Sequence, residues 1–162
     1  ILEGELYTTP RPTGPHAVAA SVLGSELGGP FHQGRGGPGG WWILDEPELR
    51  LHGDVLVPDL AGWRRERMPS LPAAAAFELA PDWICEVISP ATASFDRTRK
   101  LPIYARERVG HLWIVDPLAR TLEVFALGGD AWTLLHVFGE DADRIRAEPF
   151  EALDIELRRW WA

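Results

Sequence analysis

The chain has 162 residues, of which 46% are hydrophobic and 25% charged, a composition that excludes a disordered or fibrous protein and fits one globular domain over residues 1–162. It contains no run of about 20 apolar residues, which argues against a membrane-spanning helix and a membrane partner. The formal net charge of −8 argues against a protein that coats nucleic acid, because phosphate binding needs positive surface.

The N-terminal third predicts a strand and a helix. Gly4–Thr8 reads as a short strand, and because the chain starts at Ile1 without a methionine, we expect a short N-terminal segment to precede it. Small and aliphatic residues recur at helical spacing over His16–Leu27, which predicts a helix ended by Gly28-Gly29-Pro30.

Strands dominate the rest of the chain. We expect two strands over Trp41–Leu49 and Val55–Trp63, and a strand buried on both faces over Asp82–Ser89. A helix from Ser94 to about Val109 then leads to a buried strand over His111–Val115. Alternating residues around Gly128-Gly129-Asp130 predict a C-terminal antiparallel hairpin, Thr121–Leu127 with Ala131–Val137. This order predicts a single α/β (α+β) domain.

Two predicted strands each contain one carboxylate among apolar residues, Asp59 in the first and Glu86 in the second. An ionised carboxylate in such a position is costly unless a cation compensates it, and neither strand has an adjacent Arg or Lys. Two interpretations stay open. Each acid pairs with an arginine from a neighbouring element, or both hold a divalent metal ion such as Mg²⁺, which takes one or two protein carboxylates.

The helix that follows Glu86 carries the only lysine of the chain, Lys100; the other 15 of the 16 basic residues are arginine. Asp96, Lys100 and Tyr104 are four residues apart and share a helical face, so a helix that folds back brings the Lys100 ammonium towards both acids. Pro102 is expected to bend the helix just beyond Lys100. An Asp96–Lys100 surface ion pair is the alternative.

These residues, together with Pro58-Asp59, Glu86-Val87-Ile88-Ser89-Pro90 and Trp113-Ile114-Val115-Asp116-Pro117, resemble the Uma-type restriction endonuclease family of the PD-(D/E)xK nuclease superfamily. The resemblance implies a restriction-endonuclease-like mixed β-sheet flanked by helices, and hydrolysis of phosphodiester bonds with Mg²⁺, or Mn²⁺, as cofactor. By position, Asp59 and Glu86 are the metal ligands. The superfamily's usual lysine position holds Ile88, and Lys100 from the helix takes that role.

Other residues join this set as candidates. The resemblance implies a further acidic ligand, for which we expect Glu48, with Glu46 as the second choice. Tyr104 and Asp96 are supporting candidates beside Lys100, and His16 at the start of the first helix is expected to border the cleft.

Arginines and tryptophans suggest the partners. Arg64 and Arg65 follow the Asp59 strand, and Arg97 and Arg99 flank Lys100, so these residues are expected to frame a groove for nucleic acid, with DNA preferred. The pairs Trp41-Trp42 and Trp160-Trp161 predict a homodimer interface. The single cysteine excludes an internal disulfide and suits the cytoplasm.

Two functions from different classes compete. The first is a metal-dependent endonuclease, favoured by the presence of Asp59, Glu86 and Lys100 together. The second is a catalytically inactive nuclease fold that acts as a binding module, favoured by the acidic net charge and by Ile88.

Overall fold

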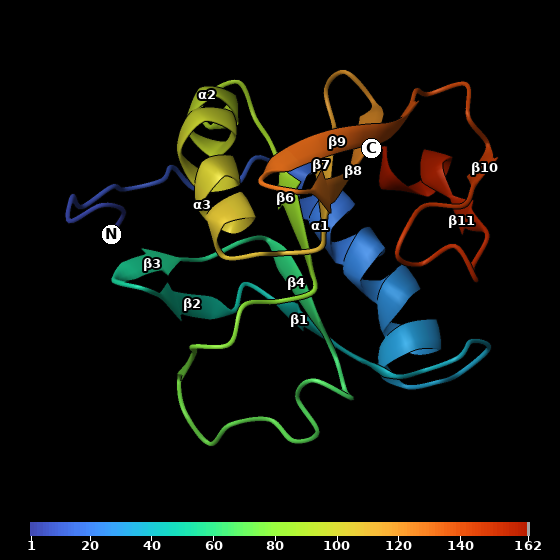
Figure 1. The fold of residues 1–162 in the computed structure, drawn as a ribbon. Helices are drawn as coiled ribbons and strands as arrows, with labels where there is room; N and C mark the ends of the chain where they lie inside the picture. Colours follow the sequence, from blue (N-terminus) through green and yellow to red (C-terminus); the bar gives the residue numbers. More distant parts are fainter. Residues whose placement is uncertain (162) are drawn as a thin grey trace.

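A six-stranded mixed sheet forms the centre of the protein (Figure 1). The structure is a computed structural model that describes residues 1–161. The strand order is β1-β4-β6-β7-β8-β9, with β6 and β7 parallel and all other neighbours antiparallel. The strands are β1 (Trp41–Asp45), β4 (Leu60–Arg64), β6 (Trp83–Val87), β7 (His111–Asp116), β8 (Thr121–Gly128) and β9 (Ala131–Phe138).

Helices cover both faces of this sheet. The helix α1 (Gly14–Leu27) packs on one face and continues into a π-helical turn, η1 (Gly28–His32). A second helical segment covers the other face and supplies the crossover that the parallel pair β6–β7 requires (Figure 1). It consists of α2 (Ala93–Phe95), the π-helical η2 (Asp96–Lys100) and α3 (Leu101–Arg106).

Two small sheets complete the domain. One consists of β3, β2 and β5, and the other of β10 and β11. Their bounds, with those of the final 3₁₀ helix, are β2 (Glu48–Leu51), β3 (Asp54–Leu56), β5 (Ala76–Phe77), β10 (Arg144–Ile145), β11 (Ile155–Glu156) and η3 (Leu157–Trp160). Among residues 1–161, no helix combines the length and the apolar character that crossing a bilayer requires.

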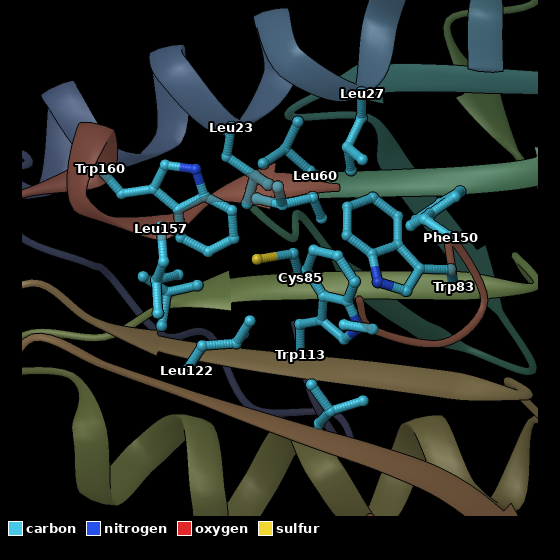
Figure 2. Close-up of a cluster of buried hydrophobic side chains, with 14 of the residues drawn as sticks. Leu23, Leu27, Leu60, Trp83, Cys85, Trp113, Leu122, Phe150, Leu157 and Trp160 are labelled. Carbon is cyan, nitrogen blue, oxygen red and sulfur yellow. The ribbon is translucent and has the colours of Figure 1, made fainter. Parts of the chain in front are cut away.

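The core has one cluster on each face of the central sheet. On the α1 face, Leu23 and Leu27 pack against Trp83 and Trp113, with the Cys85 thiol between them (Figure 2). On the other face, the residues include Ile84, Leu112 and Ile114 from the strands and Leu101, Ile103 and Tyr104 from the helix. Successive residues of β6 thus face opposite clusters, which places Glu86 on the face that α3 covers, away from Cys85.

The tryptophan pairs are largely taken up by the core of the single chain. Trp41 and Trp160 are buried in the α1-face cluster, where Trp160 donates a hydrogen bond to Glu26 (2.8 Å). Trp42 is half-buried and donates to the Met68 carbonyl (2.8 Å). These tryptophans are needed to fill and border the core, so they give no support for the predicted homodimer.

Several predicted elements are confirmed and others are corrected. The strands β6 and β7 and the hairpin β8–β9 lie where the sequence predicts them. The predicted strand Trp41–Leu49 is two strands, because Glu46 adopts a positive φ of 46° and Pro47 follows it. Val55–Trp63 is likewise split before Asp59, and Gly4–Thr8 forms no strand: the backbones of Leu2 and Glu5 pair there in a turn.

Candidate active site

Asp59 and Glu86 line one cavity of about 250 Å³, which we call the acidic cavity. Its walls come from the segment before α1, the start of α1, the turn between β1 and β2, the residues before β4, the end of β6, and the segment from Ser89 to η2. The lining residues that carry charge or titrate are Arg11, His16, Glu46, Asp59, Glu86, Asp96 and Lys100.

Sheet register brings Asp59 and Glu86 together. Leu60 of β4 pairs with Cys85 of antiparallel β6, so Asp59, immediately before β4, comes beside the end of β6. There Asp59 Oδ2 accepts a hydrogen bond from the Val87 N–H (2.7 Å), and Oδ1 lies 3.2 Å from His16 Nε2. The Asp59 carboxylate is therefore oriented by a strand and a helix, and its side chain keeps 17% exposure towards the cavity.

Residues of η2 and α3 hold the Glu86 carboxylate. Lys100 Nζ lies 3.1 Å from each carboxylate oxygen of Glu86, and the Tyr104 hydroxyl donates to Oε1 at 2.5 Å. The Glu86 side chain is only 2% exposed. Burial raises the pKa of Glu86 to about 8, against the opposite effect of the Lys100 charge.

Lys100 connects two carboxylates. Its Nζ also lies 3.1 Å from Asp96 Oδ1, so the ammonium is shared between Glu86 and Asp96. Burial alone would lower the pKa of Lys100, but these two acids raise it above its ordinary value. The alternative interpretation, a surface pair between Asp96 and Lys100, is therefore wrong, because the two residues do pair but both are buried.

His16 lines the acidic cavity, as expected, and its Nε2 pairs with Asp59. This hydrogen bond raises the pKa of His16 above its ordinary value, against the effect of partial burial. The other ring nitrogen, Nδ1, is buried and has no hydrogen-bond partner among residues 1–161. The basic groups that face Asp59 and Glu86 are therefore an imidazole and an ammonium, and no guanidinium of the described chain pairs with either acid.

The expected third acid lies elsewhere. Glu48 is in β2, outside the acidic cavity, and its carboxylate pairs with Arg50 at 2.8 Å. Glu46, the second choice, lines the cavity, and its backbone N–H donates to the Asp59 carbonyl (3.0 Å). The break between β1 and β2 explains the correction, since the turn at Glu46 directs this residue to the cavity and leaves Glu48 on the small sheet.

The predicted arginine groove is also corrected. Arg64 and Arg65 lie at the far end of β4 from Asp59, where their guanidinium groups stack on Trp41 and Trp42. Arg97 and Arg99 flank Lys100 on η2, but they pair with Glu123 (2.5 Å) and Glu3 (3.5 Å). Sequence reasoning missed Arg11, which lines the acidic cavity from a segment without regular structure.

The comparisons with known proteins agree with the fold. The profile of the Uma2 family, described as "Putative restriction endonuclease", matches residues 1–158. A crystal structure described as "a putative nuclease belonging to DUF820" from Anabaena variabilis ATCC 29413 superposes with a TM-score of 0.81 at 21% identity, covering 99% of this chain and 87% of that one. The search among curated proteins found no match. The family match extends over almost the whole chain and includes every residue of the acidic cavity, so this protein belongs to the Uma2 restriction endonuclease family.

Proposed function

We propose that this protein is a metal-dependent endonuclease that hydrolyses phosphodiester bonds of DNA, with the acidic cavity as its active site. The observation that carries the proposal is the meeting of Asp59, Glu86 and Lys100 at one cavity, which they reach from the residue before β4, from β6 and from η2. Mg²⁺ is the proposed cofactor, and Mn²⁺ is the proposed substitute. The single cysteine is unpaired and buried, which supports the cytoplasm as the place of action.

The donor set suits a hard divalent cation that keeps several waters. Residues 1–161 contain no group of three or more His, Cys, Asp or Glu side chains that could hold a metal ion. Mg²⁺ does not need one, because it commonly binds through one or two carboxylates plus water and phosphate oxygens. Asp59 and Glu86 would provide those carboxylates. Glu46, tied to the Asp59 backbone, is the nearest candidate for a water-mediated third contact.

Each neighbouring residue then has a distinct task. A bound metal ion supplies polarisation of the scissile phosphate and a lowered pKa for a water molecule. The Tyr104 hydroxyl and the Val87 N–H fix the orientation of the Glu86 and Asp59 carboxylates. Lys100 reaches the cavity as a cation, so we assign it stabilisation of the negative charge that develops on the phosphate.

A second function has its own supporting observation. Ile88, at the position of the superfamily lysine, is 4% exposed and packs in the core cluster on the face that α3 covers. Its N–H donates to the Val115 carbonyl (2.8 Å), so this position contributes to the sheet and not to the cavity. A nuclease fold without that lysine could bind nucleic acid and leave it intact, which is the inactive binding module.

Cleavage assays separate these functions. Supercoiled plasmid and labelled linear DNA are incubated with the protein in Mg²⁺, Mn²⁺ or EDTA, and the products are resolved on gels. We expect cleavage with either metal and none in EDTA. Asp59→Asn and Glu86→Gln should each lower the rate by at least about a hundredfold, since each removes a carboxylate that would hold the metal ion.

Glu48→Gln is the matched control, because it makes the same type of change at an acid outside the acidic cavity. It should cleave at the wild-type rate. Cleavage that persists in EDTA, or an equal loss in all three variants, would contradict the proposed site. Binding of DNA without cleavage in either metal would favour the binding module.

A further inference from the structure

We propose that Arg11 anchors the substrate, by binding a DNA phosphate next to the one that is cleaved. This inference rests on the proposed function for its substrate, and it assigns a binding residue that lies outside the Asp59, Glu86 and Lys100 set. Arg11 belongs to the segment Thr9–Thr13, which forms one wall of the acidic cavity and which we call the N-terminal wall.

Charge balance in the cavity identifies Arg11 as the available cation. Four carboxylates line the cavity, from Glu46, Asp59, Glu86 and Asp96. The Lys100 ammonium is shared between two of these acids and His16 pairs with a third. Arg11 is exposed and forms no ion pair with any residue in the range 1–161. A phosphate diester that enters this negative cavity needs a cation that is not already paired.

The other arginines are less suited to this role. Arg97 and Arg99 are closest in sequence to the site, and both form ion pairs with glutamates. Arg64 and Arg65 lie at the opposite end of β4 and stack on tryptophans. A guanidinium also matches phosphate geometry, because its planar fork donates two parallel hydrogen bonds to two phosphate oxygens.

The chain around Arg11 is stiff. Pro10 and Pro12 flank it, and each proline fixes its own φ and restricts the residue that precedes it. The backbone at Arg11 therefore has little freedom to lose when a ligand binds, so more of the interaction appears as affinity. Only the Arg11 side chain has to be ordered.

The start of α1 strengthens the anion preference of this wall. Thr13, the N-cap residue, and His16, in the first turn, both line the cavity, so the positive end of the 14-residue helix faces it. The first turn contains no acidic residue that would cancel this charge. Hydroxyl groups of Thr9, Ser89 and Thr92 also line the cavity and are suitable donors to phosphate oxygens.

The test measures binding apart from cleavage. A short labelled DNA duplex is titrated with wild type, Arg11→Ala, Arg11→Lys and Arg35→Ala, and anisotropy is followed in Ca²⁺ from about 50 to about 200 mM salt. Arg35 is the matched control: it is exposed, lies in the loop after η1 and does not line the acidic cavity. The steady-state constants for cleavage are measured in parallel in Mg²⁺.

We expect Arg11→Ala to weaken binding about tenfold and to reduce the salt dependence by about one phosphate contact, with an increased KM and little change in kcat. Arg11→Lys should keep the salt dependence and recover part of the affinity, and Arg35→Ala should match wild type. If Arg11→Ala binds within twofold of Arg35→Ala while wild type cleaves DNA, the anchor is wrong and the active site stands. If Arg11→Ala loses binding but wild type does not cleave, the anchor stands and the nuclease proposal fails. Wild type that binds no DNA would overturn both.

Discussion

Replacement of Lys100 by methionine is expected to destabilise the protein by about 3–5 kcal/mol. The ammonium lies 3.1 Å from both oxygens of Glu86 and 3.1 Å from Asp96, and the side chains of these acids are 2% and 5% exposed. Methionine keeps the length of the side chain but removes its charge, so Asp96 stays buried without the cation that it shares, and Glu86, whose pKa is already about 8, has to bind a proton at neutral pH. A domain of this size has a free energy of unfolding of about 5–15 kcal/mol, so the variant is expected to fold with a clearly lower stability.

The cause can be separated from a simple loss of packing. In the double variant Lys100→Met with Glu86→Gln, a neutral amide replaces the buried carboxyl group that would otherwise have to bind a proton, so part of the lost stability should return and the two changes should be strongly non-additive. Arg120→Met is the control at an exposed ion pair. Arg120 lies 3.0 Å from Glu140 and the two side chains are 47% and 64% exposed, so its removal should cost less than about 1 kcal/mol.

Urea unfolding in metal-free buffer at neutral pH measures these differences, with tryptophan fluorescence as the signal, since the chain has eight tryptophans. The explanation fails if Lys100→Met costs no more than Arg120→Met. It also fails if the double variant is less stable than Lys100→Met by the full cost of Glu86→Gln measured alone, because the two charges would then act independently.

Three further results are expected. Tyr104→Phe removes the hydroxyl that donates to Glu86 Oε1, so urea unfolding should show a loss of about 1–3 kcal/mol, while a wild-type value would mean that this bond is unimportant. Burial alone would raise the pKa of Asp54, but hydrogen bonds, chiefly from Arg106 (2.6 Å), lower it, so its contribution is present above the unfolded pKa of about 4 and is lost as pH falls through the folded pKa. Asp54→Asn should therefore cost about 2 kcal/mol at neutral pH and almost nothing in strong acid, and a cost that is the same at both would contradict the assignment. Burial raises the pKa of the Cys85 thiol well above its ordinary value, so a thiol reagent should label it only in denaturant; rapid labelling of the native protein would show that the site opens.

Much of the central sheet could be predicted because its strands have simple patterns. The strand β6 is buried at all five positions, and its apolar run is bounded by prolines in the sequence. The hairpin β8–β9 alternates around a glycine turn. The break between β1 and β2 was not predictable in the same way, because it depends on the positive φ of Glu46, a residue type that rarely adopts it. This one turn moved the predicted third acid from Glu48 to Glu46.

The candidate site could be predicted because its charged residues lie within apolar stretches of the sequence. Acids in buried strands and a single lysine are visible in the sequence, and the structure brings Asp59, Glu86 and Lys100 to one cavity. Arg11 gives no such signal, because an arginine in a proline-rich segment is ordinary surface until the fold places that segment against the cavity. The tryptophan pairs have a structural use that the sequence did not show, since Trp41 and Trp160 fill the core and Trp42 and Trp161 border it; the homodimer stays a prediction.

The irregular helix after β6 explains how three residues spaced four positions apart meet at one place: Lys100 and Tyr104 contact Glu86, and Asp96 contacts Lys100. In a regular α-helix, residues four apart are displaced by about 40° around the axis, so Asp96, Lys100 and Tyr104 would spread over about 80°. Here the Leu101 N–H donates to the Asp96 carbonyl, an i→i−5 bond, and the wider π turn reduces the rotation between Asp96 and Lys100. Pro102 has no N–H to continue the α-helical pattern across this turn, which fits the change from η2 to α3 at that point. The proline that we expected to disturb the helix therefore lies where the irregularity aligns the supporting residues on the active-site carboxylate.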